Sequence, residues 1–266
     1  MAAIIQIYNQ KGGVAKTTST IQLGGEFAKN FGLRVLMFDF DPSSNLTGYV
    51  SHSENPEMYF SDMLISYYED DTEEDMHDAI CHTDFENLDI VPATRAGMEK
   101  ASFVLSNNRF FTPAGSLNPF IEQIEDEYDV ILFDSSAGST NYNLMAMCIA
   151  NYLLIPTDDS TASVEGANLT IEDMHQCKKR LNPNIDFIGM YISRANGRRA
   201  VSRDLRELLG EQYKDKLIPI AIRDGAGVGK ASLERAPLCF SYPNDNVTKD
   251  FHSLAEYVLE YIQKGE

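Results

Sequence analysis

The sequence predicts an α/β fold: one doubly wound, mostly parallel sheet with helices on both of its faces. Short apolar runs of strand length alternate along the chain with segments whose apolar residues recur at helical spacing. Several of these runs are apolar almost throughout, as strands covered on both faces must be. The chain has 266 residues, of which 43% are hydrophobic, enough for a sizeable core. Because no long linker, internal repeat or low-complexity tract interrupts the alternation, residues 1–266 are expected to form one domain.

The first expected unit, residues 3–20, has the order strand, glycine loop, helix. Residues 3–8 are apolar and rich in β-branched side chains, Gly12 and Gly13 follow, and apolar residues recur at helical spacing after Lys16. The backbone N–H groups of such a loop and the N-terminus of its helix converge on an anion. This order therefore predicts a phosphate-binding loop.

Carboxylates are expected at the ends of two further strands. Residues 34–40 form an apolar strand with Asp39 and Asp41 at its carboxyl end, and alternation places both side chains on the same side. Residues 128–134 form another apolar strand, which ends in Asp134. Open α/β sheets bind ligands at the carboxyl ends of their strands. An aspartate in this place, after a phosphate-binding loop, is typical of an Mg²⁺ site.

The rest of the chain continues the alternation. Residues 57–82 have helix-like apolar spacing around an acidic run at 69–75. This run is expected to be a solvated loop, with a surface for a basic partner as the alternative. Further strands are expected at 88–92, 152–157, 186–192 and 217–223, and further helices at 163–181 and 247–263.

The net charge is strongly negative but unevenly distributed. Lys+Arg 22 against Asp+Glu 40 give −18 at pH 7, which for the chain as a whole argues against a nucleic-acid partner. Residues 178–235 nevertheless hold 13 Lys/Arg and 7 Asp/Glu, a local charge of +6 that leaves −24 elsewhere. Residues 54–89 hold 13 acids and no Lys or Arg. The basic surplus at 178–235 would suit a nucleic-acid partner, and ordinary solvated helix faces are the alternative interpretation.

The cysteines and the N-terminus indicate a cytoplasmic protein. The four cysteines are far apart and form no C-x-x-C pair, so reduced and mostly buried thiols are expected. The N-terminus has neither the basic region nor the apolar length of a signal peptide. No stretch approaches the roughly 18 apolar residues that a membrane span needs.

Residues 11–18 read K-G-G-V-A-K-T-T. An ordinary phosphate-binding loop has glycine at the positions of Gln10 and Ala15 and lacks the first lysine. This segment resembles the deviant Walker A motif of the ParA/MinD family of ATPases, and Asp-Phe-Asp-Pro at 39–42 resembles the D-x-D-P that follows the second strand in that family. The resemblance covers nearly the whole chain and is strongest at 3–50 and 128–170.

The resemblance implies ATP and Mg²⁺ as ligands and gives roles to individual residues. Lys16 would bind the nucleotide of its own protomer, and Lys11 would reach the nucleotide across an ATP-dependent sandwich homodimer. Asp41 would orient the attacking water, so the expected catalytic residues are Lys11, Lys16 and Asp41. Asp39 is expected to support either the Mg²⁺ shell or the P-loop lysine. The expected metal-site residues are Thr17, Asp39 and Asp134, and the expected nucleotide-binding residues are Lys11, Gly12, Gly13, Val14, Ala15, Lys16, Thr17, Thr18 and Pro219.

Two segments resemble the switches of the family. Residues 43–47 resemble the switch that follows D-x-D-P. At the second switch, relatives usually read D-x-P-P, whereas this chain reads Asp134-Ser135-Ser136. The loss of both prolines predicts a less rigid second switch.

Within the family, the resemblance favours a ParA-type positioning ATPase. Such a protein would bind non-specific nucleoid DNA as an ATP dimer. It would position or segregate a plasmid or chromosome through a ParB-like adaptor that stimulates hydrolysis. The expected DNA contacts are Arg198, Arg199, Arg203, Arg223, Lys230 and Arg235.

Other roles found within the family remain as alternatives. Positioning of a protein organelle such as a carboxysome, through an McdB-like adaptor, would use the same ATPase. A MinD-like membrane role would need Lys/Arg on the polar face of the C-terminal helix. That face carries Glu256, Glu260 and Glu266 against Lys264, so no membrane partner is expected. Amidases of the biotin and cobyrinate classes would not need Lys11. The nitrogenase-reductase, scaffold and tail-anchored targeting roles would need cysteine patterns that this chain lacks.

Overall fold

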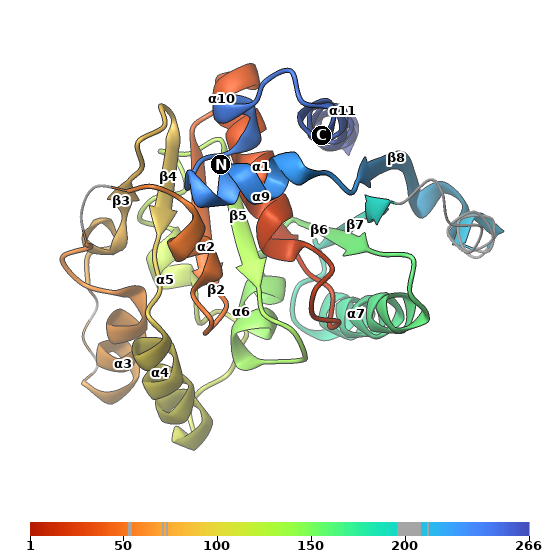
Figure 1. Cartoon of the computed structure of the whole chain (residues 1–266). Coiled ribbons are helices and arrows are strands. Elements are labelled where there is room, and N and C mark those ends of the chain that lie inside the picture. The colour runs from red at the N-terminus through yellow and green to blue at the C-terminus, as the bar shows by residue number, and fades with distance from the viewer. Residues whose placement is uncertain (53–54, 71, 73, 196–208, 212, 266) are drawn as a thin grey trace.

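The computed structural model describes residues 1–52, 55–70, 72, 74–195, 209–211 and 213–265. At its centre lies an eight-stranded sheet with the strand order β3-β4-β2-β5-β1-β6-β7-β8 (Figure 1). All neighbouring strands are parallel except β3 and β4, which are antiparallel. The strands are β1 (Ala3–Ile7), β2 (Val35–Phe40), β3 (Cys81–His82), β4 (Leu88–Val91), β5 (Val130–Ser135), β6 (Tyr152–Thr157), β7 (Asp186–Ala195) and β8 (Leu217–Arg223).

Helices cover both faces of the sheet, which confirms the predicted fold class. One core cluster joins one face of the sheet to the helices from α3 to α7, and the other joins the opposite face to α1, α9, α10 and α11. The helical elements are α1 (Lys16–Phe31), α2 (Asn45–Tyr49), α3 (Phe60–Glu69), η1 (Met76–Ala79), α4 (Arg95–Asn107), α5 (Asn118–Ile121), α6 (Asn141–Ile149), α7 (Thr161–Arg180), η2 (Lys214–Lys216), α9 (Ala226–Leu233), α10 (Leu238–Ser241) and α11 (Asn246–Gly265).

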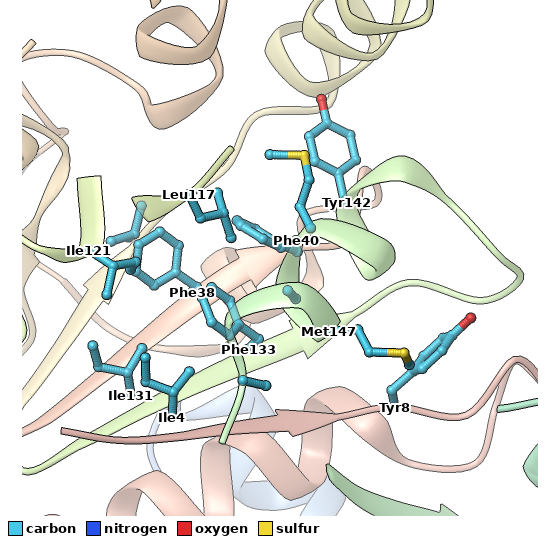
Figure 2. Packing of buried hydrophobic residues seen from close by; sticks show 14 of the residues in the cluster. Ile4, Tyr8, Phe38, Phe40, Leu117, Ile121, Ile131, Phe133, Tyr142 and Met147 are labelled. Carbon is cyan, nitrogen blue, oxygen red and sulfur yellow. The ribbon is translucent and has the colours of Figure 1, made fainter. Parts of the chain in front are cut away.

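Aromatic rings fill the first of these two clusters (Figure 2). Phe38 and Phe40 of β2 lie against Phe133 of β5, with ring centroids 5.0 and 4.9 Å apart. Met147 and Tyr142 of α6 belong to the same cluster. Alternate residues of each strand enter opposite clusters, because side chains of a strand point to opposite faces. Both faces are therefore apolar, as the continuous apolar runs predict.

The structure places most of the expected elements where the sequence predicts them. The expected strands coincide with β1, β2 and β4 to β8 within a few residues, and the helices at 163–181 and 247–263 are α7 and α11. The helical pattern at 57–82 divides into α3 and η1 before the short edge strand β3. Asp70 and Asp75, in the acidic run between them, are exposed. Among the described residues, no helix has both the length and the apolar character to cross a membrane.

The topology brings three of the predicted groups together. β1 lies between β5 and β6, and β5 lies between β1 and β2. In the strand register, Asp134 of β5 is opposite both Ile7 of β1 and Asp39 of β2. The loop after β1 therefore begins beside the two carboxylates, at the edge of the sheet where open α/β folds bind ligands.

Candidate functional site

The loop between β1 and α1 is held in a conformation that needs left-handed backbone. Gly13 has φ 83° and Ala15 has φ 67°. Ala15 immediately precedes α1, and an ordinary phosphate-binding loop has glycine there. A residue with a Cβ pays about 1 kcal/mol or more for this conformation. The loop keeps it because Val14 is buried and its carbonyl accepts a hydrogen bond from the Ser193 hydroxyl at 3.0 Å.

Lys16, the first residue of α1, turns its side chain back into the loop. Its Nζ donates to the carbonyls of Asn9 at 2.9 Å and Lys11 at 3.0 Å. Burial lowers the pKa of Lys16 to about 8, although Asp134 and Asp41 oppose this effect. The ammonium is therefore fixed at the centre of the loop and still mostly charged at neutral pH.

Lys11 has the opposite environment. Its side chain is exposed, and its Nζ contacts the Gly12 carbonyl at 3.2 Å. Its backbone N–H donates to Oδ1 of Asn9 at 2.9 Å. A Cβ on Gly166 of α7 would lie only 2.8 Å from both Cβ and N of Lys11. The backbone of Lys11 is therefore packed tightly against α7, while its side chain is exposed.

Gln10, the residue before Lys11, also holds this loop against α7 (Figure 1). The backbone N–H of Gln10 donates to the Thr170 hydroxyl at 3.0 Å, and its amide donates to Oδ2 of Asp173 at 2.8 Å. Gly166, Thr170 and Asp173 thus form one side of α7 that supports residues 9–11.

Asp134 is fully buried, and its Oδ2 lacks a hydrogen-bond partner in the described part of the chain. Burial raises the pKa of Asp134 well above its usual value, and a hydrogen bond from Thr17 opposes that rise. A buried carboxylate oxygen without a partner is costly unless a cation or a donor completes it. The Thr17 hydroxyl and Asp134 together fit an Mg²⁺ ion, which prefers oxygen ligands.

Asp39 has a different surrounding. Its carboxylate accepts hydrogen bonds from the backbone N–H and the hydroxyl of Thr47 at 2.9 and 2.6 Å, and from the N–H of Asp41 at 3.2 Å. Burial raises the pKa of Asp39 to about 6. These bonds make Asp39 the residue that holds segment 41–47 beside the loop.

A cavity of about 390 Å³ opens over the loop. The loop and Asp41 line one part of it, and a second wall comes from segments far away in the sequence. Sequence reasoning missed that distant wall, which no local motif marks. The lining residues are Gly12, Gly13, Ala15, Lys16, Thr17, Thr18, Asp41, Asn45, Ala137, Ser193, Arg194, Ile222, Arg223, Asp224, Gly225, Val228 and Phe251.

Three residues expected at the nucleotide, Lys11, Val14 and Pro219, are not among those lining the cavity. Val14 is buried beneath the loop. Pro219 is exposed on β8, three residues before Ile222, where β8 first reaches the cavity wall. On β8, the residues placed to contact a ligand in the cavity are therefore Ile222 and Arg223.

The basic residues expected to contact DNA have unequal surroundings. Arg223 forms a two-point ion pair with Asp250 at 2.7 and 2.8 Å. The guanidinium of Arg235 donates to the carbonyls of Val50 at 3.1 Å and Thr47 at 3.4 Å. Lys230 is exposed on α9. The remaining three, Arg198, Arg199 and Arg203, lie outside the described residues.

Comparison with known proteins identifies the family. A family model described as an AAA domain matches residues 2–187. The sporulation initiation inhibitor protein Soj of Bacillus subtilis is 27% identical over 259 residues, which cover 97% of this chain and 98% of Soj. A virulence plasmid ParA family protein of Chlamydia psittaci is 23% identical over 261 residues, which cover 96% of this chain and 94% of that protein. The chain belongs to the ParA/MinD family of ATPases.

Solved structures share the fold at lower identity. Cobyrinic acid a,c-diamide synthase from Mycobacterium smegmatis, with bound ATP analogue and magnesium, has a TM-score of 0.81 at 20% identity, covering 100% of this chain and 98% of that one. The Cyanothece McdA–ATP complex has a TM-score of 0.80 at 22% identity, covering 97% and 96%. The cell division ATPase MinD of Pyrococcus furiosus has a TM-score of 0.75 at 24% identity, covering 98% and 99%.

Proposed function

We propose that this chain is a ParA-type positioning ATPase, which binds ATP with Mg²⁺, dimerises around the nucleotide and hydrolyses it slowly until an adaptor protein stimulates it. The contrast between two lysines of one loop carries the proposal. Lys16 is buried and points into the phosphate-binding loop of its own chain. Lys11 is exposed, while its backbone is fixed by Asn9 and α7. An amine held in this way is available to a phosphate on a second protomer.

The cavity residues divide the chemistry of phosphoryl transfer among them. The N–H groups of the loop and the Lys16 ammonium hold the phosphates, and Thr18 lies on the same wall. Mg²⁺ held by Thr17 and Asp134 would neutralise charge on the phosphate oxygens. Asp41 lines the cavity, where its carboxylate can orient a water for attack. The direct test is phosphate release from ATP by the purified protein, which should require Mg²⁺ and the intact loop.

The dimer contact gives the first mutational prediction. Lys11→Ala should leave the affinity of the monomer for ADP within about twofold, because Lys11 is exposed and does not line the cavity of its own chain. It should abolish the dimer formed with a non-hydrolysable ATP analogue. Sedimentation velocity measures this directly. Lys100→Ala, which removes an exposed lysine from α4, serves as the control and should dimerise normally. A full dimer of Lys11→Ala would exclude a cross-protomer role for Lys11.

The competing roles within the family fit the structure less well. An amidase would not explain the exposed, backbone-anchored Lys11. A membrane-surface role would use the polar face of α11, yet that face exposes Glu256 and Glu260, and Lys264 is paired with Glu260 at 3.2 Å. Anionic lipid would be repelled by such a face.

The proposed binding partner of the ATP dimer is duplex DNA, which the dimer binds without sequence preference. The basic segment 178–235 supports this assignment, and its charge of +6 is doubled when two protomers present it together. The −24 elsewhere opposes binding only weakly, because the Debye length is about 8 Å at physiological salt. The adaptor would be a ParB-like protein for a plasmid or chromosome cargo, or an McdB-like protein for a protein organelle.

Lys230 gives the most direct test of DNA binding. Arg223 and Arg235 already bind protein groups, so their removal would disturb the fold. Lys230→Ala should weaken DNA binding by the ATP dimer and should reduce the slope of log K against log salt by about one unit. A mobility-shift titration between roughly 50 and 200 mM salt measures the slope. Lys100→Ala is again the control. Equal DNA binding by the ADP and ATP forms of the wild type would contradict control of DNA binding by the nucleotide.

A further inference from the structure

The segment 135–138 connects Asp134 to α6 and forms part of the cavity wall. Ala137 lines the cavity, and its Cβ lies 3.5 Å from the place of a Cβ on Gly12. Any displacement of this segment would therefore change the space beside the loop. In the D-x-P-P register, Ser136 and Ala137 stand at the places of the two prolines, so the position of the segment must be fixed by its contacts.

A single buried side chain makes most of these contacts. Asn143 of α6 is 1% exposed, and its Nδ2 donates to the carbonyls of Gly138 at 2.7 Å and Ser136 at 3.1 Å. Its Oδ1 accepts from the backbone N–H of Ser136 at 3.2 Å. That last bond needs an N–H at position 136, which a proline lacks. The asparagine thus uses both its donor and its acceptor on the same four-residue segment.

The opposite side of the segment is tied to β1 and its loop. Gln6, fully buried in β1, donates from Nε2 to the Ser135 hydroxyl at 3.1 Å and to the Asn143 carbonyl at 2.9 Å. The Tyr8 hydroxyl donates to the Gly138 carbonyl at 2.8 Å, and the Gly138 N–H donates to the Gln10 carbonyl at 2.9 Å. The segment is thereby held between α6 and the loop that carries Lys11.

We propose that Asn143, supported by Gln6, is a positioning residue that fixes segment 135–138 against the phosphate-binding loop and so sets the shape of the nucleotide cavity. The inference rests on the proposed function, because its consequence is measured on ATP. Hydrogen bonds from Asn143, Gln6 and Tyr8 here supply the restraint that prolines cannot supply in this sequence. The sequence predicts a less rigid second switch, and these contacts oppose that expectation at each of residues 135, 136 and 138.

Asn182 provides a matched control for Asn143. It is also buried, and its Nδ2 also donates to two backbone carbonyls of the α6 region, those of Met147 at 3.0 Å and Ala150 at 2.8 Å. These carbonyls lie at the other end of α6, away from the cavity lining. Asn143→Ala and Asn182→Ala therefore each remove a buried amide that donates to two backbone carbonyls. Only Asn143→Ala removes these bonds from segment 135–138, because Asn182 lies between α7 and β7 and binds the carboxyl end of α6.

The test compares melting temperature, KM for ATP and kcat for the two variants. Both should melt at lower temperature than the wild type. Asn143→Ala should raise KM for ATP or lower kcat by about tenfold, whereas Asn182→Ala should keep both within about twofold. Equal kinetic changes in the two variants would overturn the positioning role. If the wild type neither binds nor hydrolyses ATP, the proposed function is wrong, and this inference is then wrong as well.

Gln6→Leu covers the case in which Asn143→Ala does not fold. The variant should fold, because leucine has a volume similar to that of glutamine. The substitution also removes Oε1 of Gln6, a buried acceptor that has no hydrogen-bond partner within the described residues. Because Ser135 and the Asn143 carbonyl lose their donor, it should shift KM or kcat in the same direction as Asn143→Ala. Wild-type kinetics in a folded Gln6→Leu protein would overturn the inference.

Discussion

Lys16→Ala should fold and yet lose measurable ATP binding. The ammonium is the positive group at the centre of the loop, and its two hydrogen bonds to the Asn9 and Lys11 carbonyls fix it there. Hydrogen bonds to charged groups contribute roughly 1.5–3 kcal/mol each, so the loss of a phosphate contact and of loop order together should weaken binding by more than about a hundredfold. Isothermal titration calorimetry with ATP and ADP measures the change.

The control for this prediction separates charge from folding. Lys100→Ala removes one lysine from an exposed face of α4 and should bind ATP as the wild type does. Far-ultraviolet circular dichroism and the melting temperature should show that both variants are folded. Unchanged ATP affinity in Lys16→Ala would mean that the loop between β1 and α1 does not bind phosphate.

Asp41→Ala should separate nucleotide binding from hydrolysis. Asp41 lines the cavity beside the loop, and its backbone is held by Asp39. Removal of a group that positions or activates the attacking water costs roughly 10²–10⁴ in rate, whereas the phosphate contacts of the loop remain. We therefore expect ATP affinity within about threefold of the wild type, and kcat lower by at least about a hundredfold.

The measurement is single-turnover hydrolysis of ATP at saturating enzyme. Asp70→Ala, which removes an exposed carboxylate at the end of α3, is the control and should hydrolyse ATP normally. Hydrolysis by Asp41→Ala at the wild-type rate would assign the role to another group. Loss of both binding and hydrolysis would show that Asp41 supports the loop and does not act on water alone.

The sequence predicts the centre of the fold well because the central strands are covered on both faces. Each of β1, β2, β5 and β6 is an apolar run of five or six residues, so length and composition identify it. Many strands end in Asp, so the carboxylates at the strand ends indicate a site because they follow a phosphate-binding loop. The sequence carries no comparable signal for β3, which has two residues and pairs with β4.

The helix α6 was missed for a physical reason. It begins Asn-Tyr-Asn, and its middle is buried on several sides, so it lacks the one-sided apolar spacing of a surface helix. Its contribution to the site, Asn143, is consequently invisible in the sequence. Asn143 becomes recognisable only when the fold places it within hydrogen-bond distance of Ser136 and Gly138.

The distant wall of the cavity was missed because it is assembled from separate elements. Arg223 ends β8, Val228 lies on α9, and Phe251 lies on α11. The ion pair between Arg223 and Asp250 fastens β8 to α11 at this wall. No spacing in the sequence connects these residues, whereas the loop residues 11–18 are contiguous and could be assigned directly.

The most direct measurement of the central claim is the mass of the wild-type protein by multi-angle light scattering with no nucleotide, with ADP and with a non-hydrolysable ATP analogue. The exposed amine of Lys11, fixed through its backbone to Asn9 and α7, predicts a monomer in the first two states and a dimer of twice the 29.8 kDa chain mass in the third. The same mass in all three states would contradict an ATPase that switches its assembly on ATP.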